Sequence, residues 1–289
     1  MSEIILRAGL DAAELQAVRD LAAVVNAHDN LALKLNWELR GDQPDGLVNN
    51  LLAYDGADVV GFVALDGFGG EYEFCGMVNP SQRRRGVGTQ LLMAVVKASR
   101  ARGVTQLLLV CEHASQSGNA FVAAQGERLR YDFSEFRLEL AAGDAPPLPQ
   151  SDLHLRRAVR ADLGVLASIR AASFAEPLDD VLAELAESFD EPDSRYYLAT
   201  VGAEPVGLIG VVDDEGSAYL RSLGVSPEHQ GRGYGRAILA GAVGLLRAEG
   251  YTHFALDVAT QNSNALSLYQ SCGFRQTNRF DYYAVDLGV

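Results

Sequence analysis

Two glycine-rich segments have the residue types and spacing that bind phosphate. The first is M-V-N-P-S-Q-R-R-R-G-V-G-T-Q-L-L, residues 77–92, and the second is L-G-V-S-P-E-H-Q-G-R-G-Y-G-R-A-I-L, residues 223–239. In each, a strand-like run ends in proline, a basic or polar cluster follows, and a glycine pair opens a helical pattern. The first amides of a helix have no partner within it, glycines let an anion approach them, and the helix dipole favours negative charge. Each segment is therefore predicted to be a phosphate-binding turn.

The two turns belong to an internal duplication. A separation of 147 positions relates Pro80 to Pro227, Gly86 to Gly233, and Gly88 to Gly235. A register kept over this distance implies a duplicated domain. The apolar periodicity predicts, in each copy, a strand, helices, a hairpin, a strand, the phosphate turn, a helix, a strand, a helix and a strand. The expected fold class is α/β (α+β), with two tandem domains that each form a mixed, mostly antiparallel twisted sheet flanked by helices.

Chain length and one proline-rich stretch indicate where the copies end. The chain has 289 residues, about twice a common domain size. Residues 141–152 hold three prolines and little that could be buried, which is typical of a linker. The sequence therefore predicts an N-terminal domain over residues 1–140 and a C-terminal domain over residues 153–289. Asp11 and Glu14 have the spacing of a capping box at the start of the first helix.

Composition excludes several classes of protein. The formal net charge is −14, which argues against a nucleic-acid-binding surface. No apolar run is long enough to span a membrane, and no signal peptide is recognisable. The three cysteines have neither metal-ligand nor redox spacing and predict reduced thiols of a cytoplasmic protein. The five histidines form no zinc motif, so no metal is expected.

Acidic side chains are dense between Glu176 and Asp193, with no Lys or Arg among them. One interpretation is a solvated helix face. The other is a lip that attracts a cationic substrate. Both stay open at the level of the sequence.

The phosphate turns resemble the signature of a known family. Q-G-R-G-Y-G, residues 230–235, and R-R-R-G-V-G, residues 83–88, fit the Q/R-x-x-G-x-G/A motif of the GNAT superfamily of acyl-CoA-dependent N-acetyltransferases. The run N-S-N-A-L-S-L-Y-Q-S-C-G-F, residues 262–274, resembles the second CoA-side motif of that family. The resemblance covers nearly the whole chain as two tandem domains. A dinucleotide fold is disfavoured because its third glycine is missing, and a P-loop because no G-K-S or G-K-T follows.

The resemblance implies that acetyl-CoA is the co-substrate and that amides of both turns bind its pyrophosphate. In the second domain these residues are Gln230, Gly231, Arg232, Gly233, Tyr234, Gly235 and Arg236. In the first domain they are Arg83, Arg84, Arg85, Gly86, Val87, Gly88 and Thr89. The family's pantetheine arm pairs with the strand before each turn, here Leu223, Gly224 and Val225 in the second domain and Met77 and Val78 in the first. Asn264 is implied to hydrogen-bond this arm, and the alternative is a helix N-cap.

Direct acetyl transfer needs an unprotonated amine, an oxyanion donor and an acid for the leaving thiolate. A backbone amide between Leu223 and Val225 is the expected oxyanion donor. The family places a tyrosine at the position of Tyr269 as the acid. A phenol has a pKa of about 10 and a thiol about 8.5, so donation is plausible if the thiolate lies within hydrogen-bond distance. A packed tyrosine with a structural role is the alternative.

The first domain departs from the pattern at the acid. The tyrosine position is Ala124 when counted from Asn119, and Val122 when counted back from Gly126. Neither residue can donate a proton. The first domain is therefore expected to keep affinity for CoA and to be catalytically degenerate.

Two glutamates argue against a degenerate first domain. Glu71 and Glu73 lie on its predicted central strand, where related enzymes often carry a general base. The offset of 147 places Ala218 and Leu220 there in the second domain, with Tyr219 between them. The base of the second domain stays open among Asp213, Glu215 and a chain of waters.

The sequence thus predicts an acetyl-CoA-dependent N-acetyltransferase whose active site lies mainly in the second domain. The expected acceptor is a primary amine of a small molecule, with a cationic acceptor as one option. A non-catalytic acyl-CoA sensor is the alternative from another class. The tandem arrangement also resembles mycothiol synthase, which acetylates a cysteinyl amine on a sugar–inositol. That enzyme type carries a glutamate on the central strand of its second domain, where this chain has Tyr219.

Overall fold

The computed structural model describes residues 2–41, 46–68, 70–144, 146, 151–214 and 216–288. The chain forms two compact units. Unit 1 comprises Met1–Glu135 with Asn278–Val289, and unit 2 comprises Phe136–Thr277. None of the helices in the described ranges is long and apolar enough to cross a membrane.

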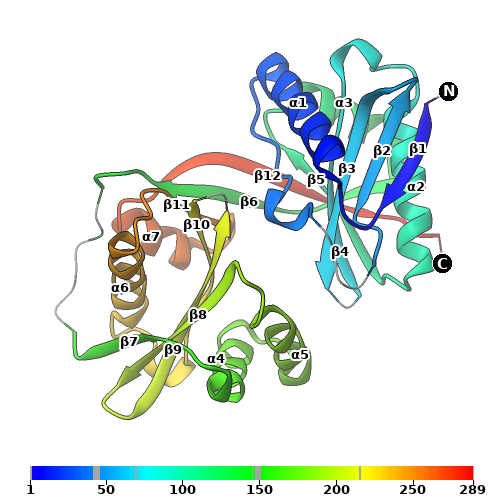
Figure 1. Ribbon diagram of the computed structural model, residues 1–289. Coiled ribbons are helices and arrows are strands. Elements are labelled where there is room, and N and C mark those ends of the chain that lie inside the picture. Colours follow the sequence, from blue (N-terminus) through cyan, green and yellow to red (C-terminus); the bar gives the residue numbers. More distant parts are fainter. Residues whose placement is uncertain are drawn as a thin grey trace. The chain divides into compact units, whose positions relative to one another are not determined.

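Unit 1 is a mixed sheet with helices on both faces (Figure 1). Its elements are β1 (Glu3–Arg7), α1 (Ala12–Asp29), β2 (Asn50–Asp55), β3 (Asp58–Phe68), β4 (Glu71–Val78), α2 (Val87–Ala101), β5 (Gln106–Glu112), α3 (Gln116–Gln125), the first part of β6 (Leu129–Leu140) and most of β12 (Arg275–Val285). The strand order includes β1-β2-β3-β4-β5-β12. The pair β4–β5 is parallel, and the pairs β1–β2, β2–β3, β3–β4 and β5–β12 are antiparallel.

Unit 2 repeats this plan. It contains β7 (Leu153–Arg157), α4 (Leu163–Phe174), α5 (Leu178–Ser188), β8 (Ser194–Val201), β9 (Glu204–Asp214), β10 (Ser217–Val225), α6 (Tyr234–Ala248), β11 (Phe254–Ala259), α7 (Ser263–Ser271) and the second part of β6. The strand order includes β6-β11-β10-β9-β8-β7, and the pair β10–β11 is parallel. The mixed, mostly antiparallel sheets confirm the predicted fold class.

Each unit takes its last strand from the other sequence copy. β12 ends the second copy, yet it pairs with β5 of the first, from Phe280 opposite Glu112 to Ala284 opposite Leu108. The second part of β6, which ends the first copy, lies beside β11 in unit 2. The ranges 1–140 and 153–289 therefore separate the sequence copies, whereas the compact units exchange residues 136–140 and 278–289. Both terminal strands have similar patterns, so the sequence does not say which edge each one pairs with.

Two apolar layers hold each unit together. In unit 1, α2 packs on one face of the sheet and α1 on the other. In unit 2, α6 packs on one face and α4 with α5 on the other. Leu91 and Leu92 of α2 are almost fully buried, and burial of each such side chain stabilises the fold by about 1.5–3 kcal/mol. The Asp11–Glu14 capping box at the start of α1 is present, as predicted.

A β-bulge in β10 changes how the two copies correspond. Arg221 lies opposite Gly210 and Gly224 opposite Leu208, so β10 carries one extra residue, and Ser222 has a φ of 52°. The central strand β4 has no such shift against β3. The offset between β4 and β10 is therefore 146 before the bulge and 147 after it.

Because of this bulge, one residue equivalence inferred from the constant offset of 147 has to be corrected. Tyr72 pairs with Leu107 and Ala218 pairs with Phe254, and all four side chains belong to the α2 or α6 layers. The structural counterpart of Glu73 is therefore Tyr219. The earlier assignment of Glu73 to Leu220 was wrong because an ungapped offset cannot show an inserted residue.

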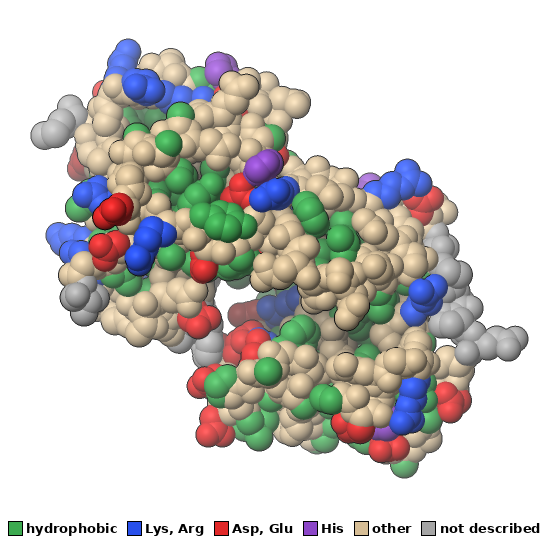
Figure 2. Space-filling model, turned by 180° about the vertical axis from the view of Figure 1, so that it is seen from behind, with side chains coloured by type: hydrophobic (Ala, Val, Ile, Leu, Met, Phe, Trp, Pro, Cys, Tyr) green, Lys and Arg blue, Asp and Glu red, His purple; other side chains and the backbone are tan. Residues whose placement is uncertain are grey.

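Basic and acidic side chains are interspersed on the face drawn in Figure 2. Lys and Arg side chains lie singly or in small groups among acidic and apolar ones, and this face carries no continuous basic surface. That distribution agrees with the acidic net charge of −14.

Candidate functional site

Both predicted turns have the same backbone. Gly86 and Gly233 occupy the N-cap positions of α2 and α6 with φ of 85° and 81°. Two positions earlier, Arg84 has a φ of 63° and Gly231 a φ of 75°. A Cβ on Gly231 or Gly233 would meet no atom within 4 Å. The turn is therefore open to a ligand at the start of each helix, where unpaired amides favour an anion.

The first side chain of each motif fixes the turn to the strand before it. Arg83 Nε donates to the carbonyl of Val78 at 3.1 Å, and Gln230 Nε2 donates to the carbonyl of Val225 at 3.0 Å. Arginine and glutamine both place a donor there, which explains why either residue satisfies the motif.

The second glycine of each pair admits a neighbouring helix. A Cβ on Gly88 would lie 3.2 Å from Phe121 of α3, and one on Gly235 would lie 3.0 Å from Leu268 of α7. A larger residue would push these helices away from the turn. Close packing of the next helix therefore also requires glycine at this position.

The two central strands part beside each turn. The ladder between β4 and β5 ends at Phe74 opposite Leu109, and that between β10 and β11 ends at Tyr219 opposite Ala255. Beyond these pairs, the described residues form no further ladder pairs between β4 and β5 or between β10 and β11. This is the geometry that the predicted pantetheine-binding edges, Met77–Val78 and Leu223–Val225, require.

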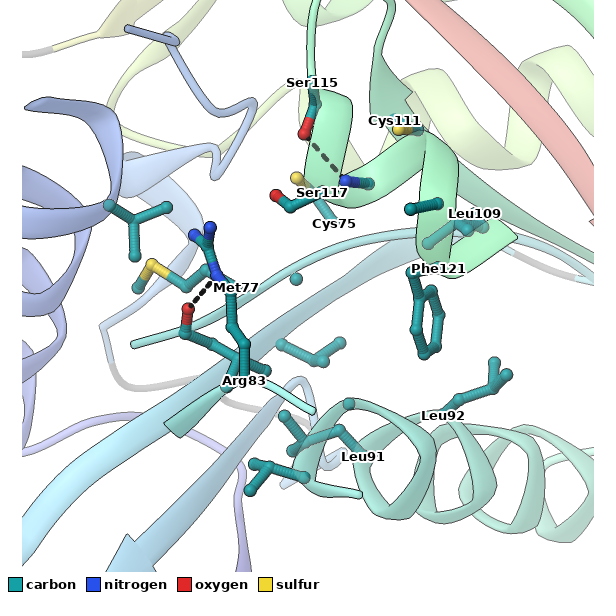
Figure 3. A pocket seen from close by; sticks show the side chains of 18 of the residues that line it. Cys75, Met77, Arg83, Leu91, Leu92, Leu109, Cys111, Ser115, Ser117 and Phe121 are labelled. Atoms are coloured by element: carbon teal, nitrogen blue, oxygen red, sulfur yellow. Dashed lines mark hydrogen bonds between the residues drawn. The ribbon is translucent and has the colours of Figure 1, made fainter. Parts of the chain in front are cut away.

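A cavity of about 470 Å³ occupies the opening in unit 1. Figure 3 shows Cys75 and Met77 of β4, Leu109 and Cys111 of β5, and Phe121 of α3 around it. Six of the seven predicted turn residues line the cavity, and Met77 and Val78 do so as well: the turn residues are Arg83, Arg84, Gly86, Val87, Gly88 and Thr89. Arg85 is outside the lining and donates to the Gln82 side chain.

A carboxylate connects two other residues of the cavity lining. Asp29, the last residue of α1, accepts two hydrogen bonds from Arg83, at 2.9 and 2.7 Å, and one from Ser117 Oγ at 3.1 Å. The bond from Arg83 lowers the pKa of Asp29 to about 2, with burial opposing it. All three residues line the cavity. We call this group the Asp29 clasp.

Burial keeps both cavity thiols protonated. It raises the pKa of Cys75 and of Cys111 to about 12. Neither sulfur is a nucleophile at neutral pH, because the thiolate is the reactive form.

Asn262 is the N-cap of helix α7 in unit 2. The Asn262 side chain accepts from the amide of Ala265 at 3.1 Å, whereas Asn264 is an exposed residue in the first turn. The alternative that Asn264 is the N-cap is therefore wrong. In unit 1 the equivalent cap is Ser115, which accepts from Gly118 at 3.0 Å.

Aligning the two helix caps favours one of the two options for the counterpart of Tyr269 in unit 1. The separation from Ser115 to Asn262 is 147 positions, so Val122 is the counterpart of Tyr269. Val122 is buried in the α2 layer. Ala124, the other option, lies two residues further along α3, is exposed and lines the cavity of unit 1.

Tyr269 lies half-buried against the α6 layer of unit 2. Its ring is 6.2 Å from that of Phe274. Burial raises the pKa of Tyr269 to about 12, and the nearby Cys272 adds to this. Within the described part of the chain its hydroxyl makes no hydrogen bond, so its proton is available to a ligand.

Hydrogen bonds and packing contacts hold the other residues of the second turn and its strand in place. Arg232 donates to the carbonyl of Glu228 at 3.0 Å. Tyr234 lies near the buried His229, with 6.4 Å between ring centres. Leu223 and Val225 pack partly against the α6 layer, as does Tyr234. The positive charge of Arg236 lowers the pKa of Cys272, against the larger effect of burial.

A polar cluster lies on the opposite face of unit 2. Tyr219 donates to Asp257 at 3.0 Å, and Arg137 binds the same carboxylate through two bonds of 2.8 and 2.9 Å. The Asp257 side chain is 5% exposed. We call these three residues the Tyr219 cluster. Of the earlier candidates for a base, Asp213 accepts from the Gly216 amide, and Glu215 lies outside the described residues.

The acidic segment is partly neutralised by arginines of α4 and its surroundings. Arg170 binds Glu184 at 2.8 and 2.7 Å and Glu176 at 3.0 Å, and Arg160 pairs with Asp190. These pairs favour the interpretation of a helix face over that of a cation-attracting lip.

Sequence reasoning missed the residues that reach the site from distant segments. Asp29 is 54 positions from Arg83, and Arg137 is 120 positions from Asp257. No local motif marks them. In the described ranges, no group of three or more His, Cys, Asp or Glu is arranged to hold a metal.

Comparison with known proteins agrees with this geometry. The model of the acetyltransferase (GNAT) family matches residues 15–126 and again residues 165–274. The chain is 31% identical to a mycothiol acetyltransferase of Kineococcus radiotolerans, over 93% of this chain and 92% of the relative. It is 29% identical to a mycothiol acetyltransferase of Nocardiopsis dassonvillei, over 95% and 94%.

Solved structures share the fold at low sequence identity. A GCN5-related N-acetyltransferase from Sphaerobacter thermophilus superposes with a TM-score of 0.79 at 19% identity, covering 98% of this chain and 96% of that one. A tandem GNAT protein from the clavulanic acid biosynthesis pathway gives a TM-score of 0.75 at 18% identity, covering 100% and 99%. With two matched domains and relatives that span its length, the chain belongs to the GNAT acetyltransferase family and is a tandem-domain N-acetyltransferase.

Proposed function

We propose that this chain transfers the acetyl group of acetyl-CoA directly to a primary amine of a small molecule, with the transfer site in unit 2. One observation carries this proposal. Both units have the phosphate turn and the parted strands, but only unit 2 has a phenol at the α7 position, where unit 1 has Val122.

Unit 2 fits the cofactor through its turn and strand edge. A Cβ at Gly231 or Gly233 would meet no atom within 4 Å, so a diphosphate has room to approach the proposed amides of Gln230–Arg236. The edge of Leu223–Val225 suits an amide-bearing arm, and one amide there is the proposed oxyanion donor. Asn264, exposed on the first turn of α7, is proposed to bind the same arm. When bound, acetyl-CoA supplies an activated acetyl group and a thiolate leaving group, so the reaction needs no metal.

Tyr269 is the proposed acid. Its pKa of about 12 keeps the hydroxyl protonated at neutral pH. A thiolate has a lower ordinary pKa, about 8.5, so full proton transfer in water would be unfavourable. The apolar surroundings that raise the pKa of Tyr269 would also raise that of a thiolate held beside it. The phenol therefore donates a hydrogen bond as negative charge develops.

The Tyr219 cluster is proposed to face the acceptor. Tyr219 stands where unit 1 has Glu73, and its hydroxyl is oriented by Asp257 at 3.0 Å. The phenol oxygen can accept a hydrogen bond from an amine while donating to Asp257. Because relatives are mycothiol acetyltransferases, a mycothiol-type cysteinyl amine is one acceptor to test. Aminoglycosides, polyamines and peptide N-termini are the others.

Unit 1 is proposed to bind acetyl-CoA without the acid. Its cavity and six lining turn residues support binding, and Val122 argues against efficient transfer. The second candidate function is acyl-CoA binding by both units without acetyl transfer. The observation in its favour is that unit 1 has Val122 where unit 2 has Tyr269.

The direct test is thiol release from acetyl-CoA with this panel of amines. We expect Tyr269→Phe to lower kcat by about 10²–10⁴-fold, the usual contribution of a positioned acid, while acetyl-CoA binding is kept. The matched control is Tyr131→Phe, because Tyr131 is an exposed tyrosine of unit 1. Unchanged turnover in Tyr269→Phe would refute the assignment. Tight acetyl-CoA binding with no turnover of any amine would favour the sensor.

A further inference from the structure

A buried ammonium lies beside Glu73, the counterpart of the Tyr219 that we propose to face the acceptor in unit 2. Glu73 is the counterpart of Tyr219 and lies one residue before the β4–β5 ladder ends at Phe74. Cys75 and Met77, two and four residues on, face the α1 layer. Because side chains alternate along a strand, Glu73 points to that same face. This is the side opposite the phosphate-turn helix α2.

Lys34 fills the space next to Glu73. Its Nζ is 3.2 Å from Glu73 Oε1, donates to the Tyr282 hydroxyl at 2.7 Å, and is 3.9 Å from Glu135 Oε2. Tyr282 in turn donates to Glu135 at 2.5 Å. The Lys34 side chain is 10% exposed. We call Glu73, Glu135 and Tyr282 the amine cage.

The amine cage has the features of a site for a primary ammonium ion. Two carboxylates and a phenol oxygen surround one nitrogen that has three N–H donors. The Lys34 nitrogen also lies 5.3 Å from the centre of the Tyr282 ring, within the range of a cation–π contact. Phe133 stacks on that ring at 4.3 Å, which holds the aromatic wall in place.

The backbone holds Lys34 in this position. The segment of residues 31–36 has no helix or strand, but the amide of Ala32 donates to Glu112 at 2.9 Å and Leu35 is buried at 2% exposure. The Lys34 amide donates to the sulfur of Cys75. Leu31 and Leu33 line the cavity. The segment therefore runs along the cofactor cavity and presents its amine at the cage.

We propose that Lys34 is a built-in substitute for the acceptor amine, which closes unit 1 to external amines. The inference rests on the proposed binding of acetyl-CoA in unit 1. Lys34 itself is held in the cage by the Ala32–Glu112 bond and the buried Leu35, so its nitrogen cannot advance to the acetyl carbon, whereas an untethered amine can. Unit 1 then binds cofactor but does not transfer its acetyl group. Removing Lys34 opens the cage to a small amine.

The first test is a binding experiment with the missing fragment. Lys34→Ala removes the atoms of n-propylammonium. We expect this variant to melt several degrees below wild type, and n-propylammonium to raise its melting temperature in a saturable way. The same concentration of 1-propanol or of NaCl should not do so. Lys97→Ala, which alters an exposed lysine on α2, should behave as wild type. If Lys34→Ala folds only in the presence of n-propylammonium, that result also counts as rescue of the variant by the amine.

The second test asks whether the cage is an acceptor site or only a structural one. In the Tyr269→Phe background, Lys34→Ala should form N-propylacetamide from propylamine and acetyl-CoA at least ~10-fold faster than Lys97→Ala, because the amine is then held beside a base. Glu73 takes one proton from the propylammonium, and the free amine then forms a bond to the acetyl carbon. The carbon–sulfur bond breaks, and the second proton of the nitrogen passes to the departing thiolate, which leaves as CoA thiol. Lys34→Met, which keeps the length of the side chain, should stay closed.

Each outcome bears on the proposal. Rescue together with acetamide formation supports it. No rescue, or rescue without acetamide in a protein whose unit 1 binds acetyl-CoA, would overturn it. The proposal would also be overturned if Lys34→Met formed N-propylacetamide as fast as Lys34→Ala. Calorimetry on a variant with the second turn disabled measures acetyl-CoA binding by unit 1 separately, so a failure of the cofactor site can be told apart from a failure of the cage.

Discussion

Placing one negative charge in the second phosphate turn tests whether that turn holds a diphosphate. Gly233 has a φ of 81°, is exposed, and would meet no atom within 4 Å if it gained a Cβ. Asp and Asn both tolerate the left-handed region at a cost of about 1 kcal/mol. Gly233→Asp and Gly233→Asn therefore have the same shape and backbone cost and differ only in charge.

The size of the charge effect follows from Coulomb's law. A carboxylate about 6 Å from a diphosphate with about two negative charges, in the dielectric of water, costs about 1.4 kcal/mol. This is about a ten-fold rise in Kd. Salt at physiological strength reduces the penalty, because the Debye length is then about 8 Å. We expect the effect to be larger at low ionic strength.

Calorimetry with acetyl-CoA and steady-state turnover measure this effect. Gly233→Asp should weaken acetyl-CoA binding to unit 2 and raise the KM for acetyl-CoA by about ten-fold relative to Gly233→Asn. Gly86→Asp makes the matched change in unit 1 and should leave turnover close to that of Gly86→Asn. Equal KM values for Gly233→Asp and Gly233→Asn would refute the assignment of the second turn. A loss of turnover in Gly86→Asp alone would place catalysis in unit 1.

Three further changes test neighbouring parts of the account. Tyr219→Phe removes the hydroxyl that donates to Asp257, so kcat/KM for the amine should fall while the KM for acetyl-CoA stays the same; a change in the KM for acetyl-CoA alone would contradict this. Asp29→Asn removes the carboxylate that binds Arg83, so acetyl-CoA should bind unit 1 a few-fold more tightly in the Gly233→Asp background, and weaker binding would count against the clasp. The pH profile of kcat should rise as the amine deprotonates and show no falling limb below about pH 10, because the pKa of Tyr269 is about 12. A falling limb near pH 8 would point to another acid. Since this pKa lies above the unfolded value, Tyr269 also favours the folded state below pH 10, and this contribution is lost as the pH rises toward 12.

The features that sequence reasoning found are those encoded by local patterns. The phosphate turns and the capping box of α1 follow from short motifs and glycine positions. The constant offset of 147 located equivalent residues wherever no residue is inserted. It failed on β10, where the bulge at Ser222 adds one residue.

The features that sequence reasoning missed depend on contacts between distant segments. The partners of the amine cage come from β4, β6 and β12, and Lys34 lies in a segment without helix or strand. The exchange of β12 into unit 1 brings Tyr282 beside Lys34, which is 248 positions away. Sequence periodicity cannot predict this contact, because it does not show which sheet edge the last strand pairs with.

The most direct measurement is a crystal structure of the protein with acetyl-CoA bound. We expect density for the cofactor in unit 2, with its sulfur within hydrogen-bond reach, about 3.5 Å, of the Tyr269 hydroxyl and its diphosphate on the amides around Gly233. A bound cofactor whose sulfur lies far from Tyr269, or a second turn that stays empty at saturating acetyl-CoA, would contradict the account.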